Sequence, residues 1–111
     1  MEKFNLYALY DRKAQLYFMP FTVQHEAEAV RTFTRMVVES DGSPLSQYPA
    51  DFDLLVLGSV GTATGILYPE VPTPRPLING LVALTDAHRE RSRYQTVLGT
   101  IQQEEPAPEA S

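Results

Sequence analysis

The feature that most constrains the fold is a change of hydrophobic period within the N-terminal part of the chain. Residues 4–10 alternate as in a strand, with Phe4, Leu6, Ala8 and Tyr10 on one side. The polar segment 11–13 separates them from a second apolar run at 15–19, so we expect a β-hairpin. Apolar residues then recur at helical spacing, as Ala29, Val30, Phe33, Met36 and Val37. This change of period alone predicts a strand–turn–strand–helix order.

The ends of these elements are predicted from residues that begin or break regular structure. Pro20 either ends the second strand or places it at a sheet edge, because proline has no N–H to donate. Thr22 is the expected N-cap of a helix over 22–39, since its hydroxyl can accept from a free amide in the first turn. The helix should end near Ser40, before Asp41-Gly42-Ser43-Pro44.

The remainder of the chain alternates apolar runs with breaks rich in glycine and proline. Residues 52–57 predict a central strand, 58–65 a flexible turn and 66–68 a partner strand. Residues 77–82 fit either a tight hairpin at Asn79-Gly80 or a helix over 77–84, and a further helix is expected over 85–101, capped by Asp86. The predicted fold class is α+β. It comprises a small antiparallel sheet of about four or five strands in ββαββ order, one covering helix and a second, C-terminal helix.

Length and composition limit the organisation further. A chain of 111 residues has room for one domain, which we place at residues 1–101. Residues 102–111 form an acidic tail rich in proline and alanine, which we expect to be disordered. The absence of cysteine excludes disulfides and thiolate metal sites. No apolar stretch is long enough for a membrane span, and no secretion signal is recognised at the N-terminus, so neither membrane insertion nor export is expected.

No residue pattern points to an enzyme, a cofactor or a metal. The glycine-rich segment 58–65 lacks the lysine that a P-loop places after its last glycine. His25-Glu26-Ala27-Glu28 lacks the second histidine of a helical zinc site. The two histidines are both flanked by charged helix residues, so neither is placed as the buried general base that nucleophilic catalysis requires. We therefore expect a protein that binds a partner without catalysing a reaction.

A net charge of −5 argues against simple electrostatic binding of nucleic acid, but the charge is unevenly distributed. Setting aside Glu104, Glu105 and Glu109 leaves eleven acidic and nine basic residues in the body of the chain. A helix on one face of the sheet would leave part of the set Tyr7, Tyr17, Phe18 and Tyr68 on the other face. Those rings would be buried by a second helix or a dimer partner, or would form a stacking platform for bases. The candidate DNA-binding residues are Tyr7, Tyr17, Arg12, Lys13, Arg31, Arg35, Arg89, Arg91 and Arg93.

The arginine and lysine residues also have plainer interpretations. The pair in the hairpin turn could simply be solvated. The cluster at 89–93 is partly offset by Asp86 and Glu90, and it could equally contact an acidic patch on a partner protein.

Several short motifs in residues 4–68 resemble the small nonstructural protein of gokushoviruses, which are Microviridae phages with single-stranded DNA genomes. They are Tyr10-Asp11 with Lys13-Ala14, Pro20-Phe21, Arg31 with Phe33, Pro49 with Asp51-Phe52, Leu57-Gly58 and Thr64-Gly65. The resemblance implies a protein absent from the virion, described as DNA-binding or as acting in the switch to single-strand synthesis and packaging. It implies no catalytic residues.

Together these observations predict a non-enzymatic accessory protein in phage DNA replication or packaging. We expect it in the host bacterial cytoplasm, binding single-stranded DNA, and expect it to be a homodimer. The alternative is a dimeric adaptor or assembly factor that contacts viral replication proteins, capsid proteins or host proteins without binding DNA.

Overall fold

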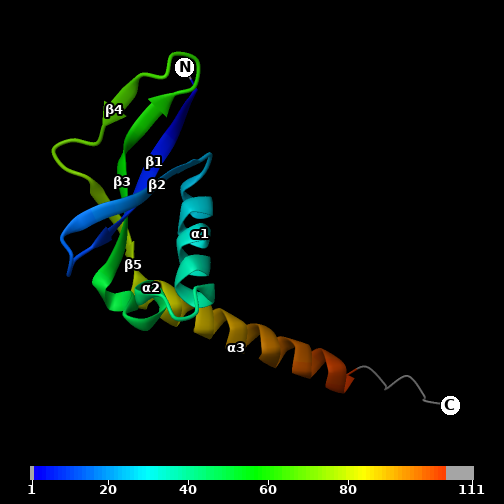
Figure 1. Cartoon of the computed structure of the whole chain (residues 1–111). Coiled ribbons are helices and arrows are strands. Elements are labelled where there is room, and N and C mark those ends of the chain that lie inside the picture. Colours follow the sequence, from blue (N-terminus) through cyan, green and yellow to red (C-terminus); the bar gives the residue numbers. More distant parts are fainter. Residues whose placement is uncertain (1, 105–111) are drawn as a thin grey trace.

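An antiparallel sheet of five strands forms the centre of the protein (Figure 1). The computed structural model describes residues 2–104, with side chains as far as residue 100. The strands are β1 (Lys3–Asp11), β2 (Leu16–Val23), β3 (Phe52–Gly61), β4 (Leu67–Pro69) and β5 (Arg75–Asn79). Their order is β2-β1-β3-β4, and β5 pairs with β3 next to β4 along the same edge. The α+β class and the central position of the third strand are confirmed.

Helices cover one side and one end of this sheet. They are α1 (Glu26–Glu39), α2 (Pro44–Gln47), the 3₁₀ turn η1 (Pro49–Asp51) and α3 (Gly80–Glu104). Figure 1 shows α1 lying along one side of the sheet, with α2 at its lower end. The long helix α3 starts beneath α1 and points away from the body. The predicted covering helix and second C-terminal helix are therefore both present.

The hydrophobic core lies between α1 and the face of the sheet that it covers. Phe33, Ala29 and Val37 of α1 are fully or almost fully buried there, at the spacing that the sequence predicts. The sheet contributes the buried side chains Tyr7, Leu9, Phe52, Leu54 and Val56, and Leu45 and Ala83 close the lower end. Each of the largest buried side chains stabilises the fold by about 1.5–3 kcal/mol relative to exposure.

The opposite side of the sheet, which we call the reverse face, carries a second set of apolar side chains. Side chains alternate along β1, so residues on either side of Tyr7 and Leu9 point away from α1. Ala8 pairs with Leu55, and Tyr10 pairs with both Asp53 and Tyr17. By the same alternation the apolar side chains of this face include Phe4, Leu6, Ala8, Tyr10, Tyr17 and Leu55. None of them belongs to the core cluster.

Two predicted features of the first two-thirds of the chain are wrong in detail, and one is confirmed. The N-cap of α1 is His25 and not Thr22, because Thr22 still pairs with Leu6 in β2. The second alternative for Pro20 is confirmed: it lies within β2, which is an edge strand, so its lack of an N–H is tolerated. The segment from Gly58 to Gly61 continues β3 instead of forming a flexible turn.

The C-terminal third also differs from the prediction. Asn79-Gly80 is neither a hairpin turn nor the middle of a short helix, since β5 ends at Asn79 and α3 begins at the next residue. Asp86 lies inside α3 and does not cap it. The helix continues to Glu104, so residues 102–104 of the predicted tail are helical. The rest of that tail lies outside the described residues.

Candidate nucleic-acid interface

The turn between β1 and β2 holds the first pair of predicted basic residues, and it uses one of them structurally. The Asp11 carboxylate accepts backbone N–H bonds from Lys13 at 2.9 Å and Ala14 at 3.1 Å, which closes the turn. The Arg12 guanidinium donates to the carbonyl of Ala50, and its Nε lies 3.3 Å from Asp53 Oδ2. Arg12 therefore ties the turn to the start of β3. Lys13 is exposed, and no ion pair is found for it within the described part of the chain.

The two tyrosines proposed for base stacking have different surroundings. Tyr7 is completely buried, stacks against Phe21 at 5.7 Å between ring centroids, and accepts a hydrogen bond from Asn5 at 3.2 Å. Its ring cannot contact a base, so that candidate is excluded. Tyr17 is 47% exposed and packs against Tyr10, with 4.6 Å between ring centroids. Tyr17 remains accessible on the reverse face.

The predicted stacking platform for bases also included Phe18 and Tyr68. In the structure neither ring extends the exposed aromatic surface around Tyr17. Phe18 points toward the core and meets Phe52 edge-on at 5.9 Å. The Tyr68 ring has the Lys3 ammonium 4.1 Å from its centroid. The uncovered aromatic surface is therefore smaller than predicted and centres on Tyr10 and Tyr17.

The side chain of Asn79 builds a junction that fixes the start of α3, the helix that carries Arg89, Arg91 and Arg93. The Asn79 amide donates to the carbonyls of Ala50 at 3.0 Å and Phe52 at 3.2 Å, and to Asp53 Oδ1 at 2.9 Å. Its Oδ1 accepts from the N–H of Leu81 at 2.9 Å, which is the bond of a helix N-cap. One side chain thus joins β5, the start of β3 and the first turn of α3.

Gly80 allows this junction to be tight. A Cβ added at Gly80 would overlap the backbone oxygen of Pro49 in η1, so only glycine fits where α3 starts. The start of α3 is consequently held against the sheet and η1. The rest of the helix crosses the end of α1 as it leaves the body (Figure 1).

A groove of about 430 Å³ lies between α1 and α3, and it brings together arginines from distant parts of the sequence. Arg31 and Arg35 lie on the α1 side, and Arg91 lies on the α3 side. A second hollow along α3 shares Ala87, Glu90 and Arg91 with the first. We call the two together the α1–α3 groove. The second hollow adds Arg93, Val97 and the 65% exposed ring of Tyr94.

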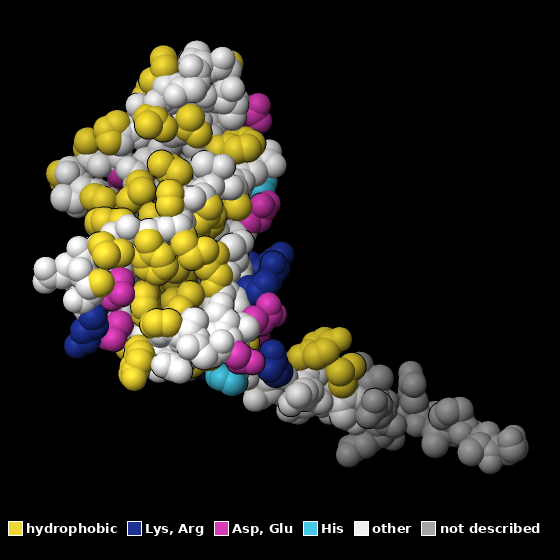
Figure 2. Space-filling model, viewed as in Figure 1, with side chains coloured by type: hydrophobic (Ala, Val, Ile, Leu, Met, Phe, Trp, Pro, Cys, Tyr) yellow, Lys and Arg dark blue, Asp and Glu magenta, His cyan; other side chains and the backbone are white. Residues whose placement is uncertain are grey.

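The charge of the α1–α3 groove is mixed, with a small excess of cations. Four arginines line it, against the carboxylates of Glu39, Asp86 and Glu90. Asp86 is 3.9 Å from Arg89, a fifth arginine that does not line the groove. Figure 2 shows basic and acidic side chains close together where α3 meets the body, with hydrophobic side chains just beyond them on α3.

The structure brings together four of the predicted residues, Arg31, Arg35, Arg91 and Arg93, and leaves the others apart. Arg89 is on the same helix but is ion-paired to Asp86. Arg12, Lys13 and Tyr17 lie at the β1–β2 hairpin. Tyr94 was not among the predicted site residues, because no local pattern shows that this position of the helix is exposed beside Arg91 and Arg93. The exposure of Tyr94 results from the direction in which α3 leaves the body.

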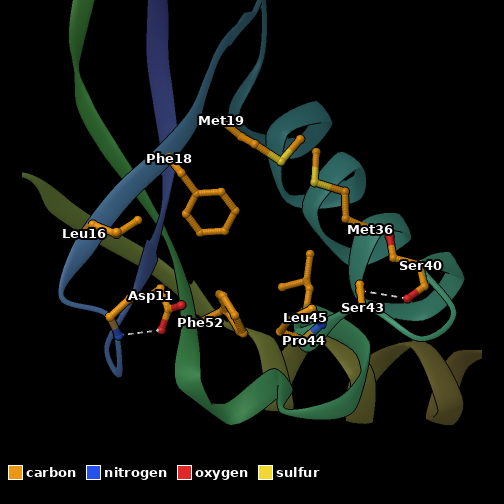
Figure 3. A pocket seen from close by; sticks show the side chains of 11 residues that line it. Asp11, Leu16, Phe18, Met19, Met36, Ser40, Ser43, Pro44, Leu45 and Phe52 are labelled. Carbon is orange, nitrogen blue, oxygen red and sulfur yellow. Dashed lines mark hydrogen bonds between the residues drawn. The ribbon is translucent and has the colours of Figure 1, made fainter.

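A separate apolar pocket of about 480 Å³ opens between β2, α1 and α2 (Figure 3). Phe18, Met36, Leu45 and Phe52 point into it, and Met19 lies at its edge with a left-handed φ of 52°. Figure 2 shows hydrophobic side chains gathered over this region. The Ser43 hydroxyl at its lower end is bonded within the chain, to the carbonyl of Ser40 at 2.7 Å. The pocket therefore suits apolar groups.

One basic residue outside the predicted set is held by two carboxylates. Arg75 of β5 lies 3.3 Å from Glu26 of α1 and 3.3 Å from Glu70. The hydrogen bond to Glu26, with the charges of both glutamates, raises the pKa of Arg75 above its ordinary value. The ion pair between Arg75 and Glu26 links the N-terminal end of α1 to β5 at the sheet edge.

Within residues 2–104, no helix is long and apolar enough to cross a membrane. Among those residues, no group of three or more histidine, aspartate or glutamate side chains is arranged to hold a metal ion.

Comparison with known proteins identifies a family. The family model described as phage ORF5 protein matches residues 4–84, which span β1 to the first turns of α3. That match covers most of the chain, so the protein belongs to the phage ORF5 protein family. No curated protein and no solved structure matches the chain. The predicted resemblance to a phage protein is confirmed, and Arg89, Arg91 and Arg93 lie beyond the matched residues.

Proposed function

Starting from its membership of the phage ORF5 protein family, we propose that this protein is a non-enzymatic accessory factor of a gokushovirus-type phage that binds single-stranded DNA. In this proposal the phosphates lie along the α1–α3 groove and contact Arg31, Arg35, Arg91 and Arg93. The protein acts in the host cytoplasm during replication or packaging of the phage genome.

The observation that carries the proposal is the convergence of these four arginines. They come from two helices far apart in the sequence, and each of these arginines is exposed along two adjoining hollows that share Ala87, Glu90 and Arg91. Arginine presents a rigid fork of donors that matches phosphate oxygens. Tyr94 lies in the same groove with 65% of its surface exposed, where a base can stack at about 1–3 kcal/mol. Basic side chains next to an exposed ring are typical of single-strand binding surfaces.

The acidic residues of the groove limit the strength of binding. Asp86, Glu90 and Glu39 repel phosphates, and the whole chain carries a charge of −5. We therefore expect binding at low salt that weakens as salt rises. If all four arginines contact phosphates, the logarithm of the affinity should fall with the logarithm of the salt concentration with a slope of about −2.8.

Fluorescence anisotropy with a labelled oligothymidine, using the full chain, tests this proposal. Arg91→Gln should weaken binding and make the salt slope shallower by about 0.7, because one phosphate contact is lost. Lys13→Gln removes the same charge from the exposed β1–β2 turn and is the matched control. It should leave the affinity within about twofold of the unmodified chain, which is a change of about 0.4 kcal/mol.

Two results would contradict the proposal. The first is no binding of the unmodified chain at low salt, although circular dichroism shows a folded protein. The second is an equal loss of affinity in Arg91→Gln and Lys13→Gln, which would mean that overall charge and not the groove determines binding.

A second function, an adaptor that binds a protein, is favoured by the apolar pocket between β2, α1 and α2. Its lining of Phe18, Met36 and Leu45 could hold an apolar side chain of a viral or host protein, and methionines adapt readily to such ligands. An absence of DNA binding would make this function the better proposal.

A further inference from the structure

We propose that the reverse face of the sheet is the surface on which a second copy of this chain packs, forming a two-fold dimer through sheet-on-sheet contact. The inference is independent of DNA binding, because the α1–α3 groove lies on the other side of the sheet. Both grooves would stay open in such a dimer.

The reverse face is apolar, yet these side chains are not part of the core cluster. Phe4, Leu6 and Tyr10 are partly exposed, and Tyr17 is 47% exposed. They surround a central pair, Ala8 at 1% and Leu55 at 7% exposure. In Figure 1 α1 lies on the opposite side of the sheet, and α2 and α3 lie at its lower end. No helix within the described residues covers this row of side chains.

Among the described strands, the reverse face also carries almost no unbalanced charge. By alternation along the strands, Asp53 is the charged strand residue of the reverse face, and it is already bound by Arg12 and Asn79. A surface of this kind attracts neither phosphates nor a strongly charged protein. It does suit an identical apolar surface, because a two-fold interface must be complementary to itself.

The size and shape of the reverse face set how much surface a second copy can cover. β1 has nine residues, and at about 3.4 Å per residue it is about 30 Å long. The sheet path β2-β1-β3-β4 spans about 15 Å across at about 4.8 Å per strand. The face therefore measures about 450 Å² in projection, which is about half of the ~800 Å² that each partner contributes to a standard interface. The small residue Ala8 at its centre allows close approach of a second sheet, at about 10 Å.

Light scattering after size-exclusion chromatography tests the dimer directly. The full chain should elute with twice the mass of one 12.4 kDa chain. Leu6→Glu places a charge on the reverse face and should produce a monomer. Leu81→Glu makes the same change at a 49% exposed position at the start of α3 and should remain a dimer. Circular dichroism checks that both variants are folded.

Cysteine cross-linking gives a readout that does not depend on the stability of Leu6→Glu. The chain has no cysteine, so each introduced thiol is unique. Under mild oxidation Leu6→Cys and Tyr17→Cys should form covalent dimers. Leu16→Cys, which lines the apolar pocket on the other side of the sheet, should not.

A monomeric mass for the unmodified chain would overturn the proposal. So would a dimer that cross-links through Leu16→Cys and not through Leu6→Cys, since that dimer would use the apolar pocket. The anisotropy titration of Arg91→Gln is measured separately, so failure of the dimer and failure of DNA binding are distinguishable.

Discussion

Asn79→Ala is the substitution that most directly tests how this fold positions its arginines. The side chain of Asn79 bonds to the carbonyls of Ala50 and Phe52, to the carboxylate of Asp53 and to the N–H of Leu81. Alanine removes all of these bonds at once. The start of α3 then loses both its cap and its attachment to β3.

The magnitude follows from counting what the amide can donate. Its two N–H groups are shared among three acceptors, so they amount to about two hydrogen bonds, each contributing about 0.5–1.5 kcal/mol. The cap on Leu81 contributes about 1 kcal/mol. Asn79 is only half-buried, so water replaces part of the loss. We expect the free energy of unfolding to fall by about 2 kcal/mol, which lowers Tm by roughly 10 °C for a domain of this size.

Urea unfolding followed by circular dichroism measures this change. Gln95→Ala removes an amide side chain from an exposed position of α3 and should change stability by less than about 0.5 kcal/mol. Amide hydrogen exchange should also become faster in the first turn of α3 in Asn79→Ala. If Asn79→Ala is as stable as Gln95→Ala, the junction does not hold α3 as described.

Three further substitutions should change the unfolding free energy in ways that the same urea titration can measure. Gly80→Ala should destabilise by about 1–3 kcal/mol because its Cβ would overlap the backbone of Pro49, whereas Gly99→Ala, in open space on the same helix, should stabilise by about 0.5–1 kcal/mol. Equal effects of the two would contradict the close approach at Gly80. Tyr7→Phe should cost about 0.5–1.5 kcal/mol, because the hydroxyl that accepts from Asn5 is lost while the buried ring stays. A loss above about 3 kcal/mol would show that the hydroxyl does more than accept this bond.

The order of elements could be predicted because it depends on local patterns. The period-two run at residues 4–10 and the helical stripe of Ala29, Phe33 and Val37 each bury one face, and both are confirmed. The helix end at Ser40 followed from the breaking residues after it. The start of α1 was misplaced because Thr22 has the chemistry of a cap but is held in β2 by its pairing with Leu6.

The candidate site could be predicted only in part. The sequence contains every arginine of the α1–α3 groove, but nothing local shows that Arg31 and Arg91 line the same hollow. Nor does it show that Arg12 is already bound to Asp53. Tyr7 and Tyr17 have similar neighbours in sequence, yet Tyr7 is buried and Tyr17 is accessible. Their strands place them on opposite faces, and only one face is covered by α1.

The sequence by itself determined the α+β class, the succession of the main helices and strands, and the face of α1 that is buried. Those properties depend on hydrophobic period and on residues that cap or break a segment, which act over a few neighbours. The tertiary structure alone decided that β5 leads directly into α3, that four arginines share one groove, and that no helix among residues 2–104 covers the reverse face. These depend on contacts between segments distant in the chain, such as Asn79 with Phe52, and no local pattern encodes them.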